Sequence, residues 1–127
     1  MLKEKLHDPA SRVLLYGTTP PRAGSAQDAV HAAAEKLSAR LARLPLDGVV
    51  VYDIQDETGR NAAARPFPFV GTVDPRAYAR LLAERTGRPA ITYKCVGTEG
   101  EAGWRAWLDE TARDCGAGFL SIVGRPA

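Results

Sequence analysis

The sequence predicts an α/β fold, one half of a β/α barrel, in which four parallel strands alternate with three helices. Short runs rich in β-branched residues alternate with longer segments of helical spacing, which is typical of consecutive βα units and a parallel sheet. The run Gly48–Tyr52 is apolar throughout, as expected of a strand that is buried on both faces. With 127 residues, the chain is expected to form a single half-barrel domain over residues 1–127.

The first strand and the first long helix follow from local signals. The first strand is predicted at Val13–Tyr16 and gives way at Gly17 to a loop with two consecutive prolines. Ser25 is the predicted N-cap of the helix, and Asp28 follows three residues later as in a capping box. The apolar helix face that is expected to cover the sheet consists of Val30, Ala33, Ala34, Leu37, Leu41 and Leu44. A short helix over residues 2–6 is expected to cover part of the place of a fourth barrel helix.

The second strand is followed by a long polar connection over residues 53–73 that has no helical period. A connection of this length between a strand and its helix is usually functional. Asp74 and Pro75 then predict the start of the second long helix, and Gly87 predicts its end.

The last two strands are expected at residues 90–96 and 119–123. The helix between them carries Trp104 and Trp107, which we expect in the core or in an interface, and Gly116 ends it. No fourth helix follows the last strand, so the unit would have two unpaired edge strands. Two copies related by a twofold axis would pair these edges and close an eight-stranded TIM barrel, which predicts a homodimer.

The composition excludes several classes of protein. A hydrophobic fraction of 45% with 25% charged residues argues against disorder, and no run approaches the roughly 20 apolar residues that a bilayer requires. Without a signal peptide, the protein is expected in the cytoplasm. Its net charge of +2 is spread among acidic residues, so no nucleic-acid partner is expected. Two cysteines and two histidines match no zinc spacing, which predicts reduced thiols and no metal.

Polar residues follow the predicted strands at the end where β/α barrels bind small molecules. Asp53, Asp56 and Glu57 are the catalytic candidates, because carboxylates transfer protons or bind an amino-bearing ring, although a solvated turn has the same composition. The cofactor-binding candidates are Tyr16, Thr18, Thr19, Gln55, Lys94 and Arg125. Lys94 could bind a phosphate or form a salt bridge with Asp53 in the barrel mouth.

The segment Leu15–Arg22, with its two prolines, resembles the opening of the methylenetetrahydrofolate reductase family, whose first strand runs into the same Pro-Pro loop. The third-strand ending Tyr93–Cys95 is similar to that family's ending in Thr-Cys. The stretches Val51–Glu57 and Arg65–Phe69 resemble a divergent bacterial branch. The resemblance spans essentially the whole chain and corresponds to the first half of the family's barrel.

The resemblance implies an FMN-dependent oxidoreductase that passes a hydride from NADH or NADPH, through the flavin, to methylenetetrahydrofolate. The chain departs from the family at two positions. Gly17 stands where the family has a proton-donating glutamate, and the turn Gly124–Pro126 lacks the family's aspartate near the flavin. Asp53, Asp56 or Glu57 could supply the proton instead.

Two functions therefore stay open at this level. The first is a reductase-like half-barrel that binds a flavin or a folate-type ligand at the carboxyl ends of the strands. The second is a non-catalytic, self-associating half-barrel, a truncated scaffold without the family's catalytic residues.

Overall fold

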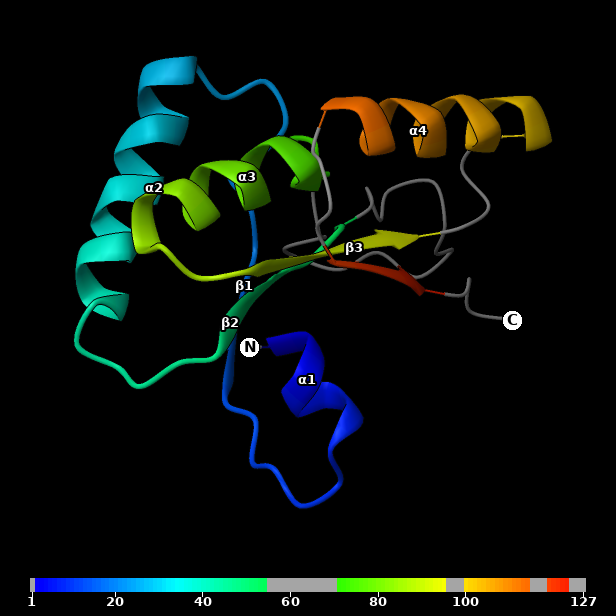
Figure 1. The fold of residues 1–127 in the computed structure, drawn as a ribbon. Coiled ribbons are helices and arrows are strands. Elements are labelled where there is room, and N and C mark those ends of the chain that lie inside the picture. The colour runs from blue at the N-terminus through cyan, green and yellow to red at the C-terminus, as the bar shows by residue number, and fades with distance from the viewer. Residues whose placement is uncertain (1, 55–70, 96–99, 115–118, 124–127) are drawn as a thin grey trace, which may run out of the picture.

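The computed structural model describes residues 2–54, 71–95, 100–114 and 119–123. Its elements, in chain order, are α1 (Leu2–His7), β1 (Leu15–Thr18), α2 (Gln27–Leu41), β2 (Gly48–Val51), α3 (Pro75–Thr86), β3 (Ala90–Cys95), α4 (Glu101–Asp114) and β4 (Phe119–Val123). The strands form one parallel sheet in the order β1-β2-β3-β4 (Figure 1). The predicted α/β fold with four parallel strands is confirmed, and it is consistent with a half-barrel.

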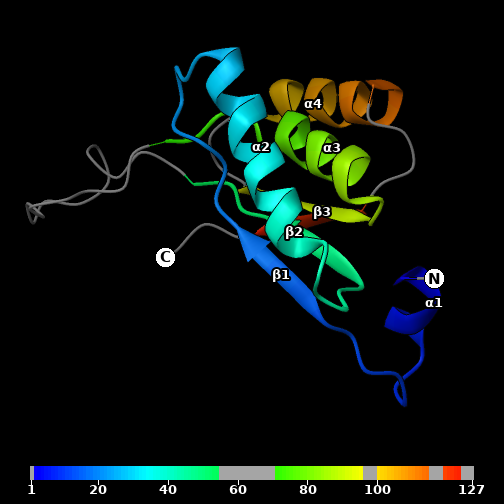
Figure 2. The ribbon, with the colours of Figure 1, turned by 90° about the vertical axis from the view of Figure 1, so that its left-hand side faces the viewer.

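The three long helices cover one face of the sheet. Connections between neighbouring parallel strands are right-handed in nearly all proteins, so successive crossover helices fall on the same side. Figure 2 shows α2, α3 and α4 together on that side, with α1 beyond the opposite face. We call the face under the three helices the helix face and the opposite one the inner face.

Helix α1 does not take the place of a fourth barrel helix, so that expectation was wrong. Leu2 is buried against the start of β2, where a Cβ at Gly48 would lie 3.2 Å from the Leu2 Cδ2 atom. Lys5 Nζ lies 2.6 Å from the Asp47 carboxylate, which also accepts a hydrogen bond from the Leu14 amide at 2.8 Å. These contacts hold α1 at the amino ends of the first two strands (Figure 1).

The core lies between the sheet and its helices. Val49 and Val51 of the central strand β2 are fully buried there, because alternate residues of a strand point to the same face. They pack against residues of α2 and α3, namely Ala34, Leu41, Tyr78, Ala79 and Leu82. This packing confirms that α2 buries the apolar face that the sequence predicts, up to Leu41.

Strand β1 begins and ends two residues later than predicted. Its register with β2 runs from Leu15 to Thr18, and the Thr18 carbonyl accepts a further hydrogen bond from the Tyr52 amide at 3.0 Å. Gly17 therefore lies inside the strand rather than in the loop. Leu14 is excluded from the strand because its amide and its carbonyl both bond to Asp47.

The helix ends agree with the sequence for α3 and differ for α2. The Asp74 side chain accepts from the Arg76 amide at 2.9 Å, and Gly87 ends α3 in the left-handed conformation with φ 69°. Ser25 was wrongly predicted as the N-cap of α2: the cap is Ala26, and the Ser25 hydroxyl donates to the Arg22 carbonyl at 2.6 Å instead. Because α2 ends at Leu41, Leu44 is not part of its buried face.

None of the helices in the described part of the chain combines the length and apolar character needed to cross a membrane. Cys95 is a reduced thiol, as expected, and Cys115 lies outside the described residues.

Replacing Leu82 with alanine should lower the free energy of unfolding by about 2–5 kcal/mol, because the side chain is fully buried between α3 and β2 and its loss leaves a cavity. Urea denaturation of the two proteins measures this difference. Leu6→Ala is the matched control: Leu6 is 51% exposed, so its replacement should change the stability by less than about 0.5 kcal/mol. Equal effects of the two changes would contradict the assigned core.

Candidate functional site

The segments that follow β1 and β2 meet at the carboxyl end of the sheet. The Ala23 amide donates to the Gly71 carbonyl, and the Val73 amide donates to the Pro21 carbonyl, both at 2.9 Å. Arg22 and Thr72 form an antiparallel bridge between these hydrogen bonds. The loop after β1 is thus held against the segment that leads into α3, and together they border the strand ends where β/α folds bind ligands.

Asp53 connects the ends of β2 and β3. Its Oδ2 atom accepts a hydrogen bond from the Cys95 amide at 2.9 Å, and the Cys95 thiol donates to the Asp53 carbonyl at 3.3 Å. The half-buried carboxylate of this catalytic candidate therefore bonds to the backbone beside it. These two bonds hold the end of β2 beside the end of β3.

The strand register assigns side chains at the carboxyl end to opposite faces. Tyr16 pairs with Val49, a residue of the helix-side core, whereas Gly17 pairs with Val50 on the inner face. Tyr52, two residues after Val50, continues the inner face. The sequence pattern does not distinguish these two faces. It therefore includes Tyr16 among the ligand-binding candidates, although Tyr16 lies on the helix face.

Tyr52 lies across Gly17 of the neighbouring strand. A Cβ at position 17 would overlap the Tyr52 hydroxyl and would lie only 2.6 Å from the Tyr52 Cζ atom. On the other side, the Tyr52 and Tyr93 rings form an edge-to-face pair with centroids 5.6 Å apart and an interplanar angle of 78°. Two aromatic side chains thus stand together on the inner face near the strand ends.

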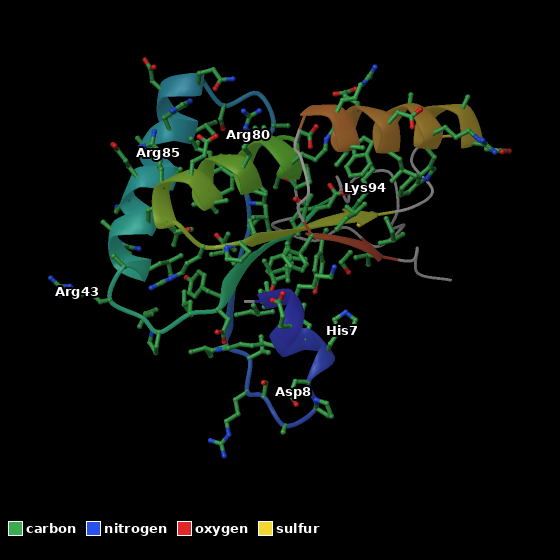
Figure 3. All side chains as sticks on the ribbon, viewed as in Figure 1. His7, Asp8, Arg43, Arg80, Arg85 and Lys94 are labelled. Carbon is green, nitrogen blue, oxygen red and sulfur yellow. The ribbon has the colours of Figure 1, made fainter. Side chains whose placement is uncertain are left out.

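Lys94 points away from this inner face. It is only 7% exposed, and its Nζ atom lies 5.1 Å from the centroid of Trp107 and 5.9 Å from that of Trp104, both in α4. Figure 3 places its label between β3 and α4. The expectation that Lys94 stands in the barrel mouth was wrong, because its position in β3 alternates with the inner-face residues Tyr93 and Cys95.

A second cation lies on the same indole ring. The Arg76 guanidinium is 4.5 Å from the Trp107 centroid, and it also donates to Thr111 Oγ1 at 3.0 Å and to Asp74 Oδ2 at 2.6 Å. Arg76 therefore joins the first turn of α3 to α4. The expected placement in the core or an interface is confirmed for Trp107, which is buried. Trp104 is half-buried and contacts Trp107 edge to face.

Burial raises the pKa of Asp74, but the hydrogen bonds from Arg76 and the nearby Lys94 charge outweigh this effect. The net result is a pKa below the ordinary value of 3.8. The ionised carboxylate therefore caps α3 and balances the two cations around Trp107.

The remaining predicted site residues fall into two groups. Thr18 ends β1 and is half-buried, and Thr19 is exposed at the start of the following loop. The others, Gln55, Asp56, Glu57 and Arg125, lie outside the described residues. The sequence missed the pairing of Tyr52 with Tyr93, because alternation within β2 and within β3 separates the two faces of each strand but does not show which faces coincide; that depends on the register between the strands.

A groove of about 210 Å³ lies elsewhere, between α2 and α3. It is lined in part by Val30, His31, Tyr78 and Arg80, and it borders on the helix layer rather than the inner face. Arg85 contacts His31, one of the lining residues, at 3.3 Å and forms an ion pair with Glu35 at 3.0 Å (Figure 3).

The chain is similar to a solved structure described as an uncharacterized protein from Clostridium thermocellum that binds two copies of 5-methyl-5,6,7,8-tetrahydrofolic acid. The two share 27% sequence identity with a TM-score of 0.73, over 98% of this chain and 38% of that one. This chain thus spans well under half the length of the protein it matches. No protein-family model and no curated protein matches the chain.

Asp74→Ala should lower the free energy of unfolding by about 1–2 kcal/mol at neutral pH, because it removes the cap of α3 and a partner of Arg76. Asp74→Asn isolates the charge. Since folding lowers the pKa of Asp74, the stability advantage of the unchanged protein over Asp74→Asn should be constant above the unfolded value and vanish as the pH falls below 3.8.

Chemical denaturation between about pH 2 and pH 7 measures both effects, because this range extends to either side of the ordinary value of 3.8. Glu101→Gln is the control, because Glu101 forms an exposed pair with Arg105 within α4 and should contribute less than about 0.5 kcal/mol. An advantage over Asp74→Asn that grows as the pH falls would contradict the assignment.

Proposed function

We propose that this protein binds a reduced folate, of the 5-methyltetrahydrofolate type, at the carboxyl ends of its strands. The observation that carries the proposal is the similarity, over 98% of the chain, to a protein that binds 5-methyl-5,6,7,8-tetrahydrofolic acid. The site geometry supports it. The loops after β1 and β2 are bonded together beside the strand ends, and two tyrosine rings stand on the adjoining inner face.

Reductase chemistry with FMN and NADH or NADPH stays a prediction of the sequence resemblance. The described residues do not fit that chemistry well. Lys94, one of the two cations expected to meet a cofactor, is buried under α4, and Arg125 lies outside the described residues. Gly17 has no carboxylate, and Asp53 bonds to the backbone of Cys95. Folate binding without reduction is therefore the activity we favour.

A second part of the proposal concerns the open sides of the sheet. Among the described residues, β1 and β4 each pair with one strand only, and the inner face beyond α1 carries half-buried apolar side chains such as Ile91, Phe119 and Val123. Parallel sheets are normally covered on both faces. We therefore retain the homodimer in which β4 of one copy lies beside β1 of the other, because it would cover this face and remove both edges.

Calorimetric titration with 5-methyl-5,6,7,8-tetrahydrofolate should give saturable binding. FMN and NADH, titrated in the same way, separate the two functions: saturable folate binding alone fits the proposed function, whereas tight FMN binding would restore the reductase. Heat-unfolded protein serves as the control for non-specific heats. Absence of saturable folate binding would refute the proposal.

Sedimentation velocity should show twice the monomer mass of 13.6 kDa at micromolar protein concentrations. Phe119→Lys places a charge on the inner face at an edge strand and should shift the protein to monomer, because a charge buried in an apolar interface is costly. Leu108→Lys, on the exposed side of α4, is the control and should leave the mass unchanged. A monomer at all concentrations of the unchanged protein would exclude the dimer.

A further inference from the structure

Two tyrosines, Tyr52 and Tyr93, stand together on the inner face, and neither belongs to the helix-side core. We call this pair the aromatic corner. Tyr52 is 38% exposed although it directly follows Val51, which is fully buried on the helix face. Its backbone is held by the hydrogen bond from its amide to the Thr18 carbonyl. The ring is therefore anchored at its base and accessible at its surface.

Tyr93 supplies the second ring of the aromatic corner. With an interplanar angle of 78°, the two rings are nearly perpendicular, so one presents a face where the other presents an edge. Tyr93 is half-buried, and its register partner on β4 is Ser121, which carries a hydroxyl into the same inner-face row. A flat ligand ring stacked on one tyrosine would meet the edge of the other and polar groups beside it.

The position of the Tyr52 ring requires a glycine at position 17. Any Cβ at position 17 would occupy the place of the Tyr52 hydroxyl, so even alanine forces the ring to move. The backbone of β1 is extended here and needs no glycine for its conformation. The absence of a side chain serves to admit the neighbouring tyrosine.

We propose that Tyr52 and Tyr93 form an aromatic subsite that stacks against the bicyclic ring of the reduced folate, with Gly17 reserving the space for Tyr52. This inference rests on the proposed function and specifies which face of the sheet the ligand meets. Aromatic stacking suits a reduced pterin because its pyrimidinone ring stays planar and carries its hydrogen-bond donors and acceptors at the rim. Each phenol adds a hydroxyl that can bond to that rim.

The chain contains an internal comparison. Tyr16 is also 38% exposed, and it lies one residue before Gly17, but its register puts it on the helix face. Tyr16 and Tyr52 are thus equally exposed on opposite faces of the sheet. A ligand that binds to the inner face should contact Tyr52, whereas the sequence-based expectation is a contact with Tyr16.

The test begins with the unaltered protein. Its four tyrosines, ring-labelled for NMR and assigned by single Tyr→Phe variants, are followed during titration with 5-methyl-5,6,7,8-tetrahydrofolate. Upfield shifts at Tyr52 and Tyr93 that exceed those at Tyr16 and Tyr78 support the subsite. Shifts confined to Tyr16, or no tyrosine shift at saturation, overturn it.

Variants give the second readout. Tyr52→Ala should raise the Kd about tenfold and Gly17→Ala should also raise it, whereas Tyr52→Phe should keep most of the affinity because the stacking ring remains. Tyr16→Ala should stay within about twofold of the unchanged protein, a difference too small to mark a stacking contact. The fluorescence of Trp104 and Trp107, which lie on the helix side, reports independently that each variant is folded.

The outcomes separate the two proposals. If the unchanged protein binds folate and Tyr52→Ala binds it equally well, the subsite is wrong and folate binding stands. If Tyr16→Ala weakens binding as much as Tyr52→Ala, the ligand does not select the inner face and the inference fails. If the unchanged protein does not bind folate, both proposals fail together.

Discussion

The pairing of β2 with its two neighbours is the constraint on which the rest of the structure depends. Parallel register sets Val49 beside Ala90 and Val50 beside Ile91, so one row of side chains enters the helix-side core and the next row faces the opposite way. A shift by one residue would exchange the two faces. The buried valines of β2 make such a shift costly, because it would bring Val49 and Val51 out of their contacts with α2 and α3. The positions of Gly17, Tyr52 and Tyr93 follow from this register.

The same alternation explains the surroundings of Lys94. A lysine on the helix face must lose most of its hydration, and an ammonium group buried without compensation would be strongly unfavourable. Two indole faces in α4 and the ionised Asp74 supply that compensation, while Arg76 occupies another side of Trp107. The arrangement joins α3, α4 and β3. It also explains why Lys94 lies under α4 and not on the inner face at the carboxyl end of the sheet.

The inner face has the opposite character, since it is apolar and only partly covered. Helix α1 closes its lower end through Leu2, beside Leu15 and Gly48, and leaves the carboxyl end with its two tyrosines accessible. A surface of this kind is suited to two kinds of contact, a flat ligand and a second layer of protein. The proposed dimer and the proposed folate site are compatible on this face, because the dimer would use the edge strands and the rows near the amino ends, whereas the ligand would use the carboxyl ends of the strands.

The sequence by itself determined the order and type of the secondary elements, because alternating apolar runs, the Asp74-Pro75 start and the Gly87 end are local signals. It also indicated a folate-related ligand through the Leu15–Arg22 resemblance. Only the tertiary structure decided which face each side chain occupies. The strand limits near Gly17 depend on hydrogen bonds of Asp47 and Tyr52, which are distant in sequence from β1. Strand register is a long-range property that periodicity within one strand does not reveal. For this reason the sequence-based site candidates include Tyr16 and Lys94, which lie on the helix face, and omit the pair of Tyr52 and Tyr93.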